Sequence, residues 1–313
     1  SKTSGDKVVK HANDGKSILK TLKQDMTTDE RVELLQNAMM KMFCITINDS
    51  HYEKIKNLGY IPVGLGKESF SNDWLRDSEG ENISEKNEFY GEYTFHYWFW
   101  KNKLKKYDQN KWIGFCQKRR FWLIKKKKIT SYNLLKRLIL KKPKNSWNKF
   151  DSVLCKPISV MGHKKMKLIK RGWKNILVDP SVFVNEGKHS IKLHFDMHHG
   201  YGVLDKAINE LSTKDRNEFR KYVENNTEFN PNIMFISKKI ILDKWFKDLF
   251  KWLFRCEKVF GTKKLKGYDQ ERLYAYLAER YLPFWFKKYT RTTVCDWGYY
   301  DLNKEKTKNN FQK

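Results

Sequence analysis

Two adjacent arginines and two carboxylates are the residues best suited to chemistry on a charged substrate. Arg119 and Arg120 are neighbours in the sequence, and the planar guanidinium group pairs directly with phosphate oxygens. We therefore expect them to neutralise a phosphate or diphosphate. Glu279 first and Asp269 second are the candidate general bases, since a carboxylate within reach of a hydroxyl can accept its proton. The spacing from Arg272 to Glu279 equally favours a structural ion pair.

Short apolar runs are the elements that would position these side chains. The run 42–47 predicts a buried parallel strand, 51–58 a helix, and 60–63 a second strand. Such a β-α-β unit places ligands beyond the carboxyl ends of its strands. The run 112–116 predicts a further strand that delivers the two arginines to the same edge. The alternative is a basic surface patch that continues into the lysines after them.

The stretch 75–102 predicts a polar loop that leads into a helix beginning near Glu85. The helix has an apolar face, because its aromatic residues are spaced four, four and three apart. The free N–H groups of a first helical turn suit a phosphate or a sugar oxygen. The loop residues are therefore candidates for binding such a ligand: Asp77, Gly80, Asn82 and Ser84. The alternative is a capped surface helix whose aromatic face belongs to the core.

Histidines and an aspartate are clustered in the segment 194–199. If this segment were extended, His194, Asp196 and His198 would share one face and could bind a divalent metal. The cluster is short, however, and no partner cluster occurs elsewhere in the sequence. We therefore favour a loop or acceptor-site role over metal binding.

Several motifs follow one another in the order found in a known family. They are Ile61-Pro62-Val63-Gly64, Asp77-x-x-Gly80-x-Asn82-Ile83-Ser84, Tyr97-Trp98-x-Trp100-Lys101-Asn102, Arg119-Arg120 after Trp112-Ile113-Gly114-Phe115, Asn232-Ile233-Met234-Phe235-Ile236, and Ala278-Glu279-Arg280 after Arg272. Over about 42–285 the chain thus resembles a family of glycosyltransferase-like proteins from capsular and surface-polysaccharide loci, catalogued as a domain of unknown function. One motif departs from the family, whose His-Tyr-Arg-Arg is here Gln117-Lys118-Arg119-Arg120, so a role for the family's histidine does not carry over.

The resemblance implies a GT-A-like fold, an α/β domain with a single Rossmann-like mixed sheet flanked by helices. It implies transfer of a sugar from a nucleotide-diphosphate donor to a hydroxyl of a surface or capsular glycan or a lipid-linked acceptor. A Mn²⁺ or Mg²⁺ cofactor is not required in this scheme, because no acid follows the strand 112–116, where many such enzymes carry Asp-x-Asp. The matching residues are Asp77, Gly80, Asn82, Ser84, Arg119, Arg120 and Asn232 for the donor, and His198 or His199 for the acceptor.

The charge balance favours an anionic partner. The 313 residues contain 64 Lys plus Arg against 36 Asp plus Glu, a formal charge of +28. Such a field suits a nucleotide diphosphate, a nucleic acid or an anionic lipid. The region 121–174 interleaves lysines with tryptophans, which fits nucleic acid, an anionic bilayer or a solvated insertion. The alternatives to a transferase are therefore a non-catalytic nucleic-acid-binding protein, which we favour less, and an inactive family member.

We expect three segments along the chain. They are a polar extension with a helix over 1–40, one domain over 41–300 with the basic insertion 121–174, and a disordered tail over 301–313. Within the domain, 175–178 predicts a strand. No run approaches the roughly 18 apolar residues that span a bilayer. Five dispersed cysteines indicate reduced thiols, so we expect a cytoplasmic protein with peripheral contact at the inner face of the membrane.

Overall fold

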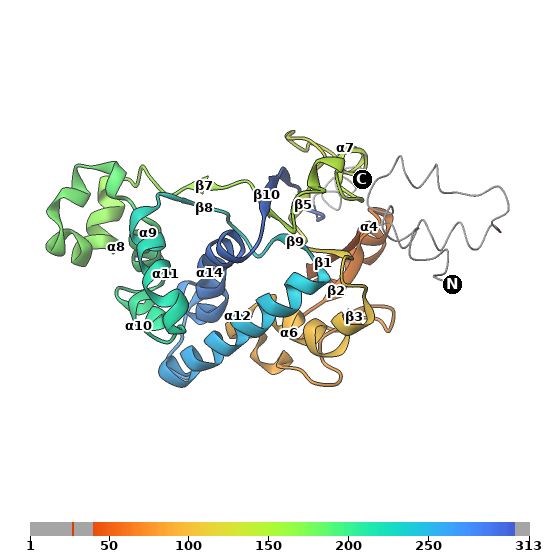
Figure 1. Cartoon of the computed structure of the whole chain (residues 1–313), viewed down its shortest axis with the longest axis horizontal. Coiled ribbons are helices and arrows are strands. Elements are labelled where there is room, and N and C mark those ends of the chain that lie inside the picture. Colours follow the sequence, from red (N-terminus) through yellow and green to blue (C-terminus); the bar gives the residue numbers. More distant parts are fainter. Residues whose placement is uncertain (1–26, 28–39, 304–313) are drawn as a thin grey trace, which may run out of the picture.

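A nine-stranded mixed sheet organises the chain, as the computed structural model shows (Figure 1). The structure describes Thr27 and residues 40–303. The main strand order is β10-β6-β9-β4-β1-β2-β3, and β5 and β11 extend the sheet beside β4. The bounds are β1 (Lys41–Thr46), β2 (Ile61–Gly64), β3 (Leu75–Arg76), β4 (Trp112–Gln117), β5 (Arg120–Trp122), β6 (Ser152–Cys155), β9 (Phe235–Lys238), β10 (Thr292–Cys295) and β11 (Trp297–Tyr299).

The pairing directions make the sheet mostly parallel on one side of its centre. β1 pairs in parallel with β2 and β4, and β2 pairs in parallel with β3. β9 lies antiparallel between β4 and β6, and β6 pairs in parallel with β10. The carboxyl ends of β1, β2 and β4 therefore meet at one edge. The predicted class, an α/β domain with a single Rossmann-like mixed sheet flanked by helices, is confirmed.

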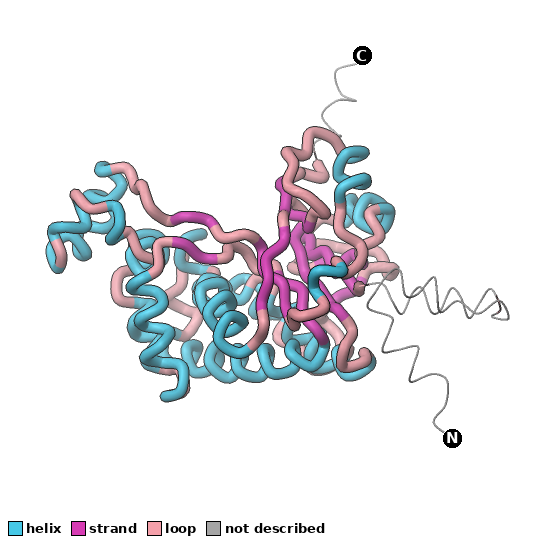
Figure 2. Tube along the Cα trace, turned by 45° about the horizontal axis from the view of Figure 1, so that its top comes forward, coloured by secondary structure: helices cyan, strands magenta, loops and turns pink. Residues whose placement is uncertain are grey.

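Alternating side chains of β1 belong to two separate hydrophobic cores. Phe43 and Ile45 belong to the larger core, while Met42 and Cys44 belong to the core on the opposite face, as the two-residue period of a strand requires. The larger core includes α5 (Asn87–Tyr90), α6 (Tyr93–Asn102), α12 (Lys239–Phe260) and α14 (Leu273–Tyr289), and the other includes α4 (Tyr52–Asn57) and α7 (Tyr132–Leu138). Figure 2 shows the long helices gathered on one side of the strands.

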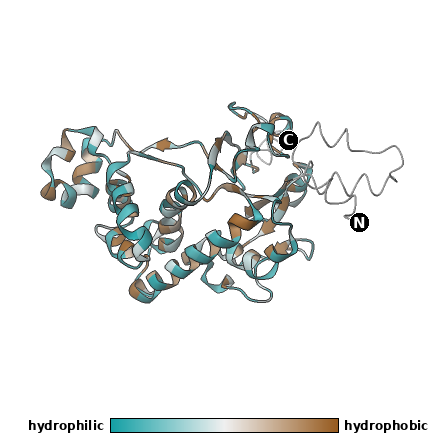
Figure 3. Cartoon of the chain, in the orientation of Figure 1, coloured by the Kyte–Doolittle hydropathy of each residue, from teal (hydrophilic) through white to brown (hydrophobic). Residues whose placement is uncertain are grey.

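Long helices follow the amphipathic pattern that the sequence predicts. In Figure 3, hydrophilic and hydrophobic segments alternate along α12, and its buried side includes Trp245, Leu249 and Leu253. A short helix, α13 (Tyr268–Glu271), precedes α14. Within the described residues no helix is both long and apolar enough to cross a membrane.

A lobe of helices extends away from the sheet (Figure 1). Its helices are α8 (Lys165–Val178), α9 (Ile191–His199), α10 (Val203–Asn209) and α11 (Thr213–Asn225). The strands β7 (Ile158–Ser159) and β8 (Glu228–Phe229) pair antiparallel and connect it to the rest of the chain.

Two predictions for this part of the sequence are corrected by the structure. The region 121–174 is not a separate insertion, because β6 within it lies inside the central sheet. The segment 175–178 is the end of α8 and not a strand. Its apolar run has a helical cause, since Ile176 continues the buried positions Leu168 and Gly172 at a spacing of four.

The predicted ends of the domain fall only partly within the described residues. The helical extension over 1–40 lies outside them, apart from Thr27 and the buried Met40. At the other end Leu302 is buried, and the side-chain oxygen of Asn303 lies 2.7 Å from the Nε2 atom of His51. The domain therefore continues through Asn303, beyond the predicted start of the tail, while 304–313 lie outside the described residues. All five cysteines are buried and free of disulfides.

Candidate active site

A cavity of about 300 Å³ lies beyond the carboxyl ends of the parallel strands. The ends of β1 and β4, the residue after β2, the junction of α5 and α6, the loop before β9, and α14 form its walls. This is the position at which open α/β sheets bind ligands.

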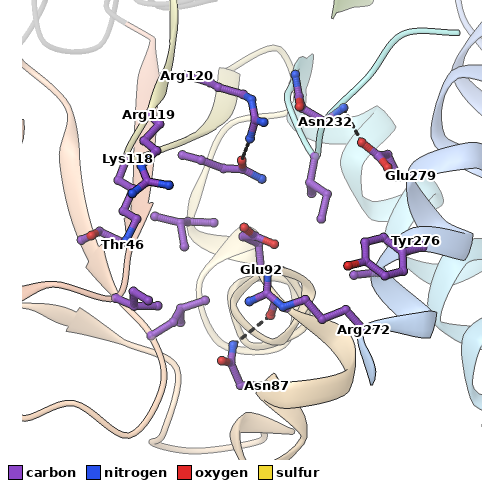
Figure 4. A pocket seen from close by; sticks show the side chains of 17 residues that line it. Thr46, Asn87, Glu92, Lys118, Arg119, Arg120, Asn232, Arg272, Tyr276 and Glu279 are labelled. Atoms are coloured by element: carbon purple, nitrogen blue, oxygen red, sulfur yellow. Dashed lines mark hydrogen bonds between the residues drawn. The ribbon is translucent and has the colours of Figure 1, made fainter. Parts of the chain in front are cut away.

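Four cationic side chains line this cavity (Figure 4). Lys118 and Arg119 come from the turn after β4, and Arg120 begins β5. Arg272 reaches in from the start of α14 on the other side. Arg119 pairs with Asp301 at 3.2 Å. Burial, and then the neighbouring Arg119, lowers the pKa of Lys118. The arginines predicted for a phosphate thus lie together with two cations that the sequence did not single out for this role.

Arg120, the first residue of β5, is oriented by its pairing partner at the end of β4. Its Nη1 atom donates to the side-chain oxygen of Gln117 at 2.9 Å. Gln117 stands at the first position of the departure from the family motif, so here a glutamine amide holds the second arginine. The same residue lines the cavity.

Glu279 lies on the far wall, on α14. Its Oε1 atom accepts a hydrogen bond from the backbone N–H of Asn232 at 2.6 Å, and its Oε2 atom pairs with the buried guanidinium of Arg280. The alternative in which Glu279 pairs with Arg272 is wrong, because Arg280 holds the carboxylate. Arg272 is directed into the cavity instead (Figure 4).

A second carboxylate, Glu92, lies between the two cationic walls (Figure 4). The continuous helix predicted from Glu85 is interrupted at Gly91, whose φ is 55°. The Nδ2 atom of Asn87 donates to the Gly91 carbonyl at 3.0 Å, and a Cβ on Gly91 would lie 3.5 Å from the Ala275 Cβ. This break places Glu92 at the cavity. Sequence reasoning missed it, although the glycine inside the apolar period was a signal.

Asn232 combines an unusual backbone with an unpaired side chain. Its φ of 67° makes it the one non-glycine residue with a positive φ in the described part of the chain. Its Nδ2 atom is buried and has no hydrogen-bond partner among the described residues. Because Asn232 lines the cavity, this amide is a donor available to a ligand.

Two residues of the predicted donor loop, Asp77 and Ser84, line an adjoining cavity of about 440 Å³. This cavity shares Asn87 and Arg272 with the first. Asp77 is only 2% exposed, and burial raises the pKa of its carboxyl group. Its Oδ2 atom has no hydrogen-bond partner within the described structure.

Gly80 and Asn82 shape the same loop and do not belong to the lining of these two cavities. The Oδ1 atom of Asn82 accepts from the Ser84 backbone N–H at 3.1 Å and from its hydroxyl at 2.9 Å. Gly80 has a φ of 68°, and a Cβ there would lie 2.4 Å from the side-chain oxygen of Asn102. The loop needs these residue types for its own conformation.

Asp269 and the predicted acceptor histidines lie behind the wall of the cavity. The Asp269 side chain is 48% exposed and pairs with Arg171 at 3.2 Å. The Nδ1 atom of His199 donates to the Asp269 carbonyl at 2.7 Å, and its ring stacks on Tyr276 at a centroid distance of 3.9 Å. Tyr276 lines the cavity, so His199 contacts the site through that ring. His199 itself lines a different cavity of about 660 Å³.

The alternative of an extended metal-binding segment is wrong, because 194–199 belong to helix α9. His194 and His198 lie one turn apart with ring centroids separated by 4.4 Å. Asp196 instead accepts from Asn175 at 2.8 Å and pairs with Lys192 at 3.2 Å. Across residues 40–303, no three His, Cys, Asp or Glu side chains are grouped to hold a metal ion.

Fold and cavity define the class of this protein: a Rossmann-like α/β protein with a cation-lined cavity at the carboxyl ends of its parallel strands. The chain belongs to the family described as Domain of unknown function (DUF4422), which matches residues 41–291. The family membership expected from the ordered motifs is thereby confirmed at that level.

One solved structure has a similar fold. It is that of a WbbM bifunctional glycosyltransferase in the apo form, with a TM-score of 0.54 and 17% sequence identity. The match covers 83% of this chain and 45% of the other, so the chain spans less than half of that protein. At this identity the match shows the fold alone. No curated protein sequence matches the chain.

Proposed function

We propose that this protein is a glycosyltransferase that moves a sugar from a nucleotide-diphosphate donor to a hydroxyl of a surface or capsular glycan. The observation that carries this proposal is the meeting of Lys118, Arg119 and Arg272 in one cavity at the carboxyl ends of the parallel strands. Fixed cations there match a diphosphate leaving group, on which negative charge develops as the bond to the sugar breaks. The fold shared with a glycosyltransferase supports the same function.

In this scheme the donor lies across the two adjoining cavities. The diphosphate lies among the cations, and the unpaired amide of Asn232 donates to the sugar. Asp77 and Ser84 bind the more distant part of the donor in the second cavity. Gly80 and Asn82 hold the loop that presents them.

The reaction needs one proton to be removed from the acceptor hydroxyl. A carboxylate takes that proton, the hydroxyl oxygen bonds to the anomeric carbon, and the bond from that carbon to the diphosphate oxygen breaks with its electron pair going to the leaving group. Glu279 is the first candidate base, because its carboxylate lies on the α14 wall of the cavity. Glu92, which forms no ion pair with another described residue, is the second.

The arginines replace a metal ion in this proposal. Hard divalent cations need oxygen ligands, whereas the chain that leaves the end of β4 reads Gln117-Lys118-Arg119-Arg120. The retained arginines also argue against an inactive family member. Gln117 makes a defined contact with Arg120 where the family has a histidine, so the departure leaves the second arginine in place.

A thermal-shift screen tests the donor site. The chain is mixed with a panel of nucleotide sugars and their bare nucleotides, each with Mn²⁺, with Mg²⁺ or with EDTA. A saturating ligand at about 100 times its Kd stabilises the fold by roughly 2.7 kcal/mol. We expect one nucleotide sugar to raise the melting temperature selectively, and the shift to survive in EDTA.

A matched pair of variants ties the shift to the cavity. Arg272→Ala removes one cationic wall, and Lys221→Ala removes an exposed lysine on α11 as the control. We expect the first to weaken donor binding about 10-fold or more and the second to leave it unchanged. A shift with DNA or RNA, and none with any nucleotide sugar, would overturn the proposal in favour of a nucleic-acid-binding protein.

A further inference from the structure

Helix α8 in the outlying lobe has one side that is packed and one that is not. Leu168 and Gly172 are buried, and a Cβ on Gly172 would lie 3.3 Å from the Cγ atom of Met197 on α9. Asn175 extends this contact by donating to Asp196 at 2.8 Å. The helix is therefore fixed in orientation, and its opposite side is presented outward by the lobe.

The outward side carries an apolar stripe. Met166, Ile169, Trp173 and Leu177 are spaced three, four and four apart, so they follow one another on one face. Their exposed fractions are 62%, 48%, 50% and 72%, respectively. Val178, at the end of the helix, is 75% exposed. Large apolar side chains aligned in this way expose a continuous surface, in contrast to single exposed residues, which need no explanation.

Lysines flank this stripe and carboxylates do not. Residues 164–178 contain no Asp or Glu. The one arginine, Arg171, pairs with Asp269 on the side toward the domain. Among the described residues, none of the lysines forms an ion pair: Lys164, Lys165, Lys167, Lys170 and Lys174. The Nζ atom of Lys174 lies 5.5 Å from the ring centroid of Trp173, which places a cation beside the stripe.

The lobe holds this helix at one end of the molecule (Figure 1), and hydrophobic segments are visible in it (Figure 3). We propose that α8 is a docking surface for an anionic lipid bilayer, with the stripe inserted at the headgroup level and the lysines against the lipid phosphates. A tryptophan with its indole in an apolar row and cations on the flank is the composition of interfacial helices.

Charge and polarity together select the bilayer over other occupants. A nucleic acid would pair with the lysines but would leave Ile169 and Leu177 in water. A second copy of this helix would cover the stripe, but it would bring two unpaired rows of lysines together. An anionic membrane alone offers an apolar interior and negative phosphates in adjacent layers. This inference is independent of the proposed reaction, although it would bring the site to lipid-linked acceptors.

Vesicle flotation of the full chain tests the proposal. One set of vesicles is phosphatidylcholine alone, and in the other about a third of the lipid is phosphatidylglycerol. We expect binding to the anionic vesicles that weakens with salt. Trp173→Asp combined with Leu177→Asp should reduce it at least 10-fold, whereas Ile240→Asp, at a 42% exposed residue of α12, should leave it unchanged. Equal binding by the two variants, or no binding by the wild type, overturns the proposal.

An attached fluorophore reports insertion directly. Because all five native cysteines are buried, a Leu177→Cys variant can be labelled selectively with an environment-sensitive dye, and Ile240→Cys is the control. Anionic vesicles should shift the emission at position 177 to the blue and leave position 240 unchanged. If the emission at position 177 does not shift, and if the wild-type chain is a dimer whereas Leu177→Asp is a monomer, the face binds a second copy of the chain and the proposal is wrong. Nucleotide-sugar binding is measured on the same variants. A variant that binds the nucleotide sugar but not the vesicles is folded and has lost docking alone. A wild type that binds the vesicles but no nucleotide sugar contradicts the proposed reaction and not the docking.

Discussion

The carboxylate of Glu279 accepts a hydrogen bond from the backbone N–H of Asn232 at 2.6 Å. This contact joins α14 to the loop before β9 across 47 residues of sequence. It holds Asn232 at a φ of 67°, a left-handed conformation that an asparagine tolerates better than most residues. The same carboxylate thus positions the side-chain amide that we assign to the donor sugar.

Asn232→Gly and Asn232→Ala separate the amide from the backbone. Both variants lose the side-chain donor, so we expect both to bind the nucleotide sugar about 10-fold more weakly. Only alanine is strained at this φ, by about 1 kcal/mol, so only Asn232→Ala should lower the free energy of unfolding. Donor titration and urea unfolding measure the two effects. Unchanged donor affinity in the glycine variant would remove Asn232 from the donor site.

Glu279→Gln and Glu92→Gln decide between the two carboxylates. A glutamine keeps the size of the side chain and loses the proton-accepting charge, so the true base should lose about 100-fold or more in kcat. Donor affinity should change far less. Glu224→Gln, at an exposed residue of α11, is the matched control. If neither variant slows transfer, the base lies elsewhere, and Asp269, which stays a prediction, becomes the next residue to test.

The sequence predicted the sheet better than the site. The runs that became β1 and β4 are continuously apolar because both faces of these strands are buried, and that pattern is visible without a structure. The place of Arg119 and Arg120 could be predicted from this strand, because side chains just beyond the carboxyl end of a central parallel strand lie at the edge of the sheet where ligands bind.

The remaining site residues depend on contacts that the sequence does not display. Glu92 reaches the cavity only because the helix breaks at Gly91 against α14. Glu279 forms its ion pair with Arg280 and not with Arg272, so the Arg272 side chain is directed into the cavity. Asp269 has suitable chemistry, yet its ion pair with Arg171 turns it toward solvent. Each outcome is decided by tertiary packing between segments far apart in the chain.

Asp77→Asn tests whether a buried carboxyl group is kept for binding. Burial raises the pKa of Asp77 above its ordinary value of 3.8. Above pH 3.8 the unfolded chain therefore releases this proton more readily than the folded one, so the carboxyl group costs stability as the pH rises. The neutral asparagine should unfold at a higher temperature than the wild type at pH 7, with a gap that closes towards pH 3.8.

The same variant should bind the nucleotide sugar more weakly, because Asp77 lines the donor cavity. Ser78→Ala is the control, at the next residue of the same cavity lining. It should leave nucleotide-sugar binding unchanged if the carboxyl group of Asp77, and not any change in the loop, is what binding needs. A variant that is more stable and binds the donor as well as the wild type would leave Asp77 without a role in binding.

His96 is a buried histidine with no polar contact. It is fully buried in α6, and neither ring nitrogen has a hydrogen-bond partner among the described residues. Its ring lies 4.4 Å from that of Phe115, centroid to centroid. Burial lowers the pKa of His96 from 6.5 to about 3, so the folded protein keeps it neutral. His96→Phe removes two unsatisfied nitrogens and should raise the free energy of unfolding by about 1 kcal/mol at pH 7.5.

The effect of His96→Phe should grow in acid. Below pH 6.5 the unfolded chain binds a proton at His96 that the folded chain cannot accept until about pH 3. Because of this residue, the free energy of unfolding of the wild type falls by about 1.4 kcal/mol for each pH unit below 6.5. The phenylalanine variant does not show this loss. Between pH 7.5 and 5.0 the gap in the free energy of unfolding should widen by about 2 kcal/mol, measured by urea unfolding at both pH values. Phe235→Leu changes the same core without a titrating group, so its gap to the wild type should stay constant. A constant gap for His96→Phe would show that His96 binds a proton as readily in the folded protein as in the unfolded chain.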